Sequence, residues 1–140
     1  MKANELMIGD WVQCTYWHNP HILQVYELKR AGDDELKIVV VEDMIPLVFQ
    51  EVYIEPIPLT AEILEKNGFI RQQFGHFRYK NEDNDLAMVF YPKEKNYTEG
   101  GYDYIDIYKG RMILREMPIS YVHELQHALR LCGIDKEIVL

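Results

Sequence analysis

Residues 53–60, YIEPIPLT, divide the chain into two parts of different character. Pro56 and Pro58 end the strands that precede them, because proline cannot donate to a β-ladder and biases the residue before it toward extended geometry. Thr60 then supplies a hydroxyl N-cap for a helix. This stretch predicts an α+β protein with a β-rich unit at 1–57 and an α+β unit at 58–140.

The segment before this stretch is predicted to form several short strands. Turn signals at 9–10, 19–20 and 32–34 separate runs that are rich in β-branched and aromatic residues, among them 36–41. A further strand is predicted at 49–54. Roughly four or five strands in so short a segment are typical of a small SH3-like β-barrel or of a strongly curved meander.

The second unit is predicted to contain two helices around an antiparallel meander. The first helix spans 60–67 and ends at Gly68, and strands follow over about 69–116. The last helix spans about 118–132 and ends at Gly133, with Ile134 placed for a Schellman contact. Its apolar positions share one side, so we expect this helix to pack on the sheet.

Tyrosines are concentrated in and beside the strands that border the 92–101 loop. Within 102–108 the tyrosines alternate with Ile105 and Ile107, so the aliphatic residues are expected to face the core and the tyrosines to face outward. Tyrosine is favoured at protein interfaces, although cross-strand packing is the favoured explanation for any single one, and the case for a contact surface rests on the group. The predicted binding surface consists of Tyr91, Tyr97, Tyr102, Tyr104 and Tyr108.

The last helix contains the one motif with catalytic spacing, HELQH at 123–127. In such a motif His123 and His127 bind zinc and Glu124 acts as general base. A catalytic zinc site needs a third protein ligand, and no spacing in the sequence indicates which residue supplies it. The alternatives are Asp135 or Glu137 after the motif, and upstream residues such as His76, His18 and His21. The helical wheel places both imidazoles away from the apolar side, so a solvated polar side is the competing explanation and the one we favour.

The charge balance restricts the class of partner. The chain has 15 basic and 23 acidic side chains, a net charge of −8. Residues 1–60 carry four Lys or Arg against ten Asp or Glu, whereas 61–140 carry eleven against thirteen. The best phosphate contacts available are Arg71, Arg78 and Lys80, so nucleic-acid binding is an alternative that the net charge disfavours. A solvated strand or turn explains the same three residues.

Compartment signals favour the cytoplasm. Glu5 lies where a signal peptide would be apolar, and the longest apolar runs, 38–41 and 44–49, are far below the roughly 20 residues that span a bilayer. Cys14 and Cys132 form neither a metal pair nor a redox motif, so we expect two reduced thiols.

Three stretches together resemble one protein family: LMIGDWV at 6–12, YIEPIPLT with EKNGF over 53–69, and YVHELQ with LCGI over 121–134. The chain is similar in them to short proteins of unassigned activity encoded in Bacteroides-type genomes and their prophages. The resemblance implies that asparagine can replace His127, which would leave the zinc pair incomplete. It also implies a cytoplasmic accessory protein that binds a host or phage macromolecule.

The expected function is therefore that of a non-enzymatic binding protein, without a cofactor, which contacts another protein through the tyrosine-rich strands or the barrel edge. One alternative is a zinc-dependent hydrolase that uses the HELQH motif. The other is a nucleic-acid-binding module.

Overall fold

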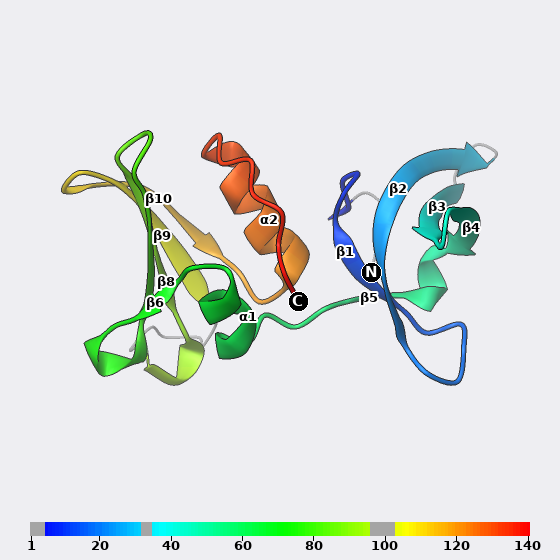
Figure 1. The fold of residues 1–140 in the computed structure, drawn as a ribbon, viewed down its shortest axis with the longest axis horizontal. Coiled ribbons are helices and arrows are strands. Elements are labelled where there is room, and N and C mark those ends of the chain that lie inside the picture. The colour runs from blue at the N-terminus through cyan, green and yellow to red at the C-terminus, as the bar shows by residue number, and fades with distance from the viewer. Residues whose placement is uncertain (1–4, 32–34, 96–102) are drawn as a thin grey trace. The chain divides into compact units, whose positions relative to one another are not determined.

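The computed structural model describes residues 5–31, 35–95 and 103–140. The chain divides into two compact units, Met1–Ile57 and Pro58–Leu140, which we describe separately (Figure 1). Each contains one five-stranded antiparallel sheet, so the protein is mixed α+β as the sequence predicted. Within the described residues, every helix lacks the length and apolarity that crossing a bilayer requires.

The sheet of the N-terminal unit has the strand order β4-β3-β2-β1-β5. Its elements are β1 (Trp11–Cys14), β2 (His21–Ala31), β3 (Glu35–Glu42), β4 (Ile45–Gln50), the 3-10 helix η2 (Glu51–Tyr53) and β5 (Ile54–Pro56). The two edge strands, β4 and β5, are not paired with each other in the described residues, so the sheet does not close into a barrel.

The N-terminal turn is held by a buried acid. Asp10 is fully buried, and its Oδ2 accepts a hydrogen bond from the Met7 backbone N–H at 2.7 Å, while the Gly9 N–H donates to the Val25 carbonyl at 2.6 Å. These bonds satisfy polar groups that would otherwise be buried without partners. The core below the turn consists of Leu6, Val12, Cys14, Leu23, Val25, Ile38, Val40, Phe49 and Ile54.

The strand predicted at 49–54 is wrong in its position. β4 begins four residues earlier, at Ile45, and η2 separates it from the three-residue β5. The hairpin between β3 and β4 turns through Asp43 and Met44, whose φ angles are 47° and 68°. Methionine rarely adopts a positive φ, and neither turn residue is the glycine or asparagine that usually marks such a turn. The sequence therefore does not predict a turn at this position.

The sheet of the C-terminal unit is a meander in chain order, β10-β9-β8-β7-β6. The strands are β6 (Ile70–Arg71), β7 (Phe77–Asn81), β8 (Leu86–Tyr91), β9 (Tyr104–Lys109) and β10 (Met112–Pro118). Short 3-10 helices η3 (Gln73–Gly75) and η4 (Lys93–Lys95) lie in the connections, and the unit has two α-helices, α1 (Ala61–Lys66) and α2 (Val122–Leu131).

Hydrogen bonds confirm the predicted start of α1 and the predicted end of α2, whereas the predicted start of the last helix near 118 is wrong, because β10 continues to Pro118 and α2 begins at Val122. Thr60 Oγ1 accepts from the Ile63 N–H at 3.3 Å, which is the expected N-cap of α1. At the end of α2, Gly133 has φ 68° and the Ile134 N–H donates to the Leu129 carbonyl at 3.0 Å, as in a Schellman motif. Glycine adopts this left-handed conformation without steric cost.

Both helices lie on one face of the C-terminal sheet (Figure 1). α2 is tied to the sheet at both ends, because the Ile119 N–H donates to the Asp103 carbonyl and Asn84 Nδ2 donates to the Cys132 carbonyl. The strands bury an apolar inner face toward the helices: Phe77, Met88, Phe90, Ile105 and Ile107. The opposite face of the sheet is covered by no helix in the described part of this unit.

Candidate functional site

The uncovered face of the C-terminal sheet gathers three of the predicted tyrosines. Strand pairing sets Tyr91 opposite Tyr104 and Ala87 opposite Tyr108. The rings of Tyr91 and Tyr104 are stacked, with centroids 4.6 Å apart and planes at 13°, and the hydroxyls of Tyr91 and Tyr108 lie 3.3 Å apart. The other two predicted residues, Tyr97 and Tyr102, are outside the described residues.

The same face carries two of the three predicted phosphate contacts. Arg78 pairs with Val89 and Lys80 pairs with Ala87, so both cations lie beside the tyrosine rows. We call this surface the outer face and define it by His76, Arg78, Lys80, Val89, Tyr91, Tyr104, Asp106 and Tyr108.

Arg71 does not belong to this group. It pairs with Phe77, whose side chain is buried on the helix side of the sheet. The Arg71 guanidinium lies 5.1 Å from the centroid of that ring, and its Nε is 3.1 Å from Glu65 Oε1. The basic cluster predicted from the sequence is therefore split between the two faces, because the register of β6 and β7 sets Arg71 opposite Phe77 and sets Ile70 opposite Arg78.

A buried carboxylate lies beneath the tyrosines. Asp106 is 6% exposed, and the Tyr108 hydroxyl donates to its Oδ2 at 3.1 Å. Its other oxygen, Oδ1, is buried and has no hydrogen-bond partner among the described residues. Burial raises the pKa of Asp106, the Tyr108 hydrogen bond lowers it, and the neighbouring Glu116 carboxylate raises it further. The alternation of side chains along β9 predicts that Asp106 lies on the same side as the tyrosines. It does not predict that Asp106 is buried.

Burial also raises the pKa of the Tyr108 phenol, and its contacts with Tyr91 and Asp106 act in the same direction. Tyr108 therefore remains a neutral hydrogen-bond donor at physiological pH. The outer face thus holds a fixed network of hydroxyl groups above one carboxylate.

A hollow of about 380 Å³ opens on the outer face. Its floor is Ala87 and Val89, and Arg78 and Arg111 contribute cationic side chains. The His76 imidazole also lines it and lies 4.4 Å from the Tyr91 ring. Neither His76 nor Arg111 was predicted to belong to a binding surface. The sequence indicates only that Arg111 lies in the two-residue turn between β9 and β10.

The cations of this surface have no ion pairs with described residues. Arg78, Lys80 and Arg111 form no salt bridge there, although acids outnumber bases in the chain by 23 to 15. Lys66 and Arg71 of the same unit are both paired with glutamates. The outer face can therefore accept an anionic group without breaking an existing pair.

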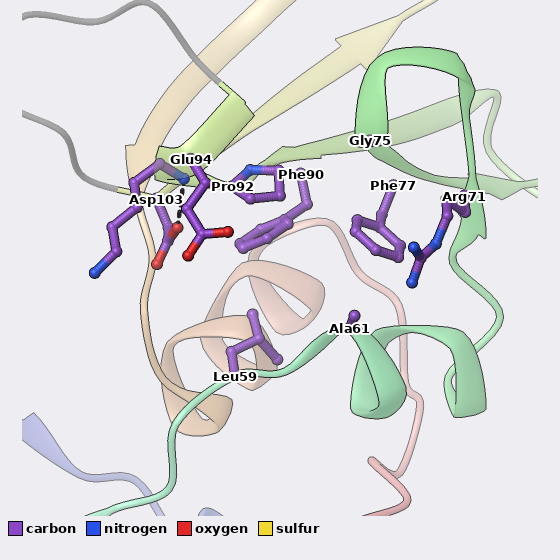
Figure 2. A pocket seen from close by; sticks show the side chains of 10 residues that line it. Leu59, Ala61, Arg71, Gly75, Phe77, Phe90, Pro92, Glu94 and Asp103 are labelled. Atoms are coloured by element: carbon purple, nitrogen blue, oxygen red, sulfur yellow. Dashed lines mark hydrogen bonds between the residues drawn. The ribbon is translucent and has the colours of Figure 1, made fainter.

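A second hollow, of about 360 Å³, lies on the helix side of the sheet (Figure 2). Figure 2 shows Leu59 and Ala61 on one side and Phe77 and Phe90 on the other, so its centre is apolar. Its one arginine, Arg71, is already paired with Glu65. Lys93, Glu94 and Asp103 also line this hollow, and Asp103 Oδ1 accepts a hydrogen bond from the Lys93 backbone N–H at 2.7 Å.

The HELQH motif has a structural role for its glutamate. Glu124 Oε2 accepts backbone hydrogen bonds from Ser120 at 2.6 Å and from Tyr121 at 3.0 Å, so the carboxylate caps the first turn of α2. The ring centroids of His123 and His127 lie 5.7 Å apart. In the described residues no group of three His, Cys, Asp or Glu side chains is arranged to hold a metal ion, so the third zinc ligand has no candidate there.

The prediction that both imidazoles are solvated is wrong for His123, which is only 5% exposed. Buried positions in α2 occur in consecutive pairs, at 122–123, 125–126 and 128–129. Burial therefore extends beyond the apolar stripe onto positions held by His123 and Gln126. Hydrophobic periodicity cannot reveal this, because these residues are polar.

The chain matches no protein-family model, no curated protein and no solved structure. The geometry of the described residues is therefore the basis for a functional proposal. It offers an uncovered sheet face with ordered hydroxyl groups and cations, an arrangement suited to reversible contact with an anionic surface.

Proposed function

We propose that this protein is a non-enzymatic binding protein that contacts another protein through the outer face of its C-terminal sheet. The observation that carries the proposal is that Tyr108, Arg78 and Arg111 line one hollow, on the sheet face that also carries the stacked pair Tyr91 and Tyr104. Tyrosine and arginine are the residue types that interface centres favour, because each combines a large contact area with directional hydrogen bonding.

The partner surface is an acidic segment. Arg78, Lys80 and Arg111 have no salt bridge with any described residue, whereas the chain as a whole carries a net charge of −8. The net negative charge of the chain repels most acidic molecules. The three cations attract an acidic segment only when its carboxylates reach this face.

A protein partner fits the outer face better than a nucleic acid does. Tyr91 and Tyr104 already stack on each other, and His76 contacts Tyr91, so these rings are engaged with one another rather than arranged to stack on bases. A phosphate backbone would also meet the net charge of −8.

The proposal also covers the fold of the N-terminal unit and the cellular compartment. We infer that the N-terminal unit is an open SH3-like barrel, which is supported by its strand order, the register shift in β2 and the 3-10 helix before β5. We also place the protein in the cytoplasm, as an accessory protein of the prophage-associated family that it resembles. The free thiols of Cys14 and Cys132 support a reducing compartment.

The test is the binding of a fluorescein-labelled peptide of alternating Glu and Val to the full chain, followed by fluorescence anisotropy. The neutral Gln counterpart is the reference peptide. We expect the Arg78→Glu/Arg111→Glu variant to bind the acidic peptide at least about tenfold more weakly than the wild type, because two attractive charges become repulsive.

The matched control is Lys109→Glu/Arg115→Glu, which changes the net charge equally on the same sheet. These exposed residues pair with Leu86 and Ile107 and so lie on the helix side. The control should bind within about twofold of the wild type. Equal binding of the Glu and Gln peptides would contradict the proposal, and preferential binding of labelled oligo-dT would favour the nucleic-acid alternative.

A further inference from the structure

The N-terminal unit carries an aromatic cluster that the outer face does not involve. Tyr16 follows β1, Phe49 lies on β4 and Tyr53 belongs to η2. The Tyr16 ring centroid is 5.1 Å from that of Tyr53, 5.8 Å from that of Phe49 and 5.8 Å from that of Trp17. Tyr16 stands nearly perpendicular to both Tyr53 and Trp17, with interplanar angles of 87° and 89°.

This cluster borders a hollow of about 370 Å³, lined by Tyr16, Leu47, Val48, Phe49, Gln50 and Tyr53. Trp17, Leu47 and Tyr53 pack against the buried core of the unit, so the base of the hollow is firmly supported. Tyr16 is nevertheless 59% exposed and Val48 is 54% exposed. Exposed apolar groups gathered at one concavity are typical of a binding site.

The hollow runs along an open strand edge. Four consecutive residues of β4, from Leu47 to Gln50, line it. Because successive side chains of a strand point to opposite faces, a hollow that contacts all four lies along the edge of the strand. β4 is an edge strand that pairs only with β3 in the described residues. Its outer edge can accept an added extended strand.

The charge of the unit indicates which side chain such a strand would contribute. Residues 1–57 contain four Lys or Arg against ten Asp or Glu, a net of −6. Asp43 and Glu51 flank β4 in sequence, and Glu42 pairs with His21, whose ring lies 4.5 Å from Trp17. One base, Lys37, lies opposite Gln50 on β3. Electron-rich rings in an acidic setting attract a cation.

We propose that this aromatic hollow binds an extended segment of another protein, which adds to the edge of β4 and lays a Lys or Arg side chain against the exposed ring of Tyr16. The backbone of β4 supplies hydrogen bonds that do not depend on sequence. The rings supply selectivity for a cation on a long apolar stem.

The test measures the affinity of the full chain for a fluorescein-labelled peptide of alternating Thr and Val with one central Lys. The reference peptide carries norleucine, which has the same apolar stem without the charge. The Lys peptide should bind at least about tenfold more tightly than the norleucine peptide.

Tyr16→Ala should lose at least about tenfold in affinity, whereas Tyr16→Phe keeps the ring and should stay within about twofold of the wild type. Val48→Lys is a second variant at an exposed position, and the cation that it adds should also abolish binding. Equal binding of the two peptides, no binding of either, or wild-type affinity in Tyr16→Ala would each overturn the proposal. Arg78→Glu/Arg111→Glu should leave this binding unchanged, so the two proposed sites can fail independently.

Discussion

Asp106 lies in an environment that is costly to the fold. Its carboxylate is buried, only one oxygen accepts a hydrogen bond from a described residue, and Glu116 lies opposite it on β10. A buried charge with incomplete hydrogen bonding destabilises the folded state. The carboxylate orients the hydroxyl of Tyr108, which donates a hydrogen bond to it.

The raised pKa of Asp106 has a defined consequence for stability. The folded protein holds this proton at pH values where the unfolded chain has lost it, so stability falls as pH rises above the ordinary pKa of 3.8 toward the folded value. Asp106→Asn removes the ionisation. At neutral pH we expect this variant to be more stable than the wild type by about 1 kcal/mol, and to lose the advantage at low pH.

Urea unfolding at several pH values measures this difference. Asp135→Asn, at an exposed position, is the control and should be neutral throughout. A variant at position 106 that is less stable than the wild type at neutral pH would show that the carboxylate has a stabilising partner.

Asn67 attaches the C-terminal segment, residues 134–140, to α1. It is 1% exposed, and its Nδ2 donates to the carbonyls of Ile63 and Val139, both at 2.7 Å. Its Oδ1 accepts from the Val139 N–H at 2.9 Å, and Lys136 Nζ donates to its backbone carbonyl at 2.6 Å. The end of the chain, within the described residues, belongs to no helix or strand, and the side-chain amide of Asn67 holds it through these hydrogen bonds.

Asn67→Ala should lower the free energy of unfolding by about 2–3 kcal/mol, because it leaves buried backbone groups without partners. Denaturant unfolding provides the measurement. Lys66→Met removes only exposed contacts with Glu62 and Leu140, so it should cost less than about 0.5 kcal/mol. Similar losses in the two variants would contradict the role assigned to Asn67.

The start of α2 depends on Glu124. Glu124→Ala removes the acceptor for two backbone N–H groups and should cost about 1 kcal/mol, whereas Glu124→Gln keeps an acceptor oxygen and should cost less. Thermal unfolding with and without EDTA separates this capping role from a zinc site. If EDTA lowers the midpoint of thermal unfolding, helix capping by Glu124 does not fully explain the HELQH motif.

For the whole molecule, the features that could be predicted from sequence are those with local causes. Thr60 and Gly133 determine helix ends through bonds to neighbouring residues, so their effects follow from sequence alone. The α+β class follows from the same signals. The alternation of β9 likewise predicts which side of the strand carries Tyr104 and Tyr108.

The features that could not be predicted depend on pairing between distant residues. The register between β6 and β7 places Arg71 on the helix side, away from Arg78. The role of Asn67 depends on Val139, which is far away in sequence. The turn at Asp43 and Met44 lacks glycine, so the sequence does not reveal where β4 begins.

We propose that the outer face of the C-terminal sheet binds an acidic protein segment. The most direct measurement is backbone chemical-shift mapping of the ¹⁵N-labelled full chain during titration with the acidic Glu-Val peptide. We expect concentration-dependent shifts centred on Arg78, Val89 and Tyr108, with the strands of the N-terminal unit unaffected. Shifts confined to other surfaces, or none at peptide concentrations that saturate the anisotropy signal, would contradict it.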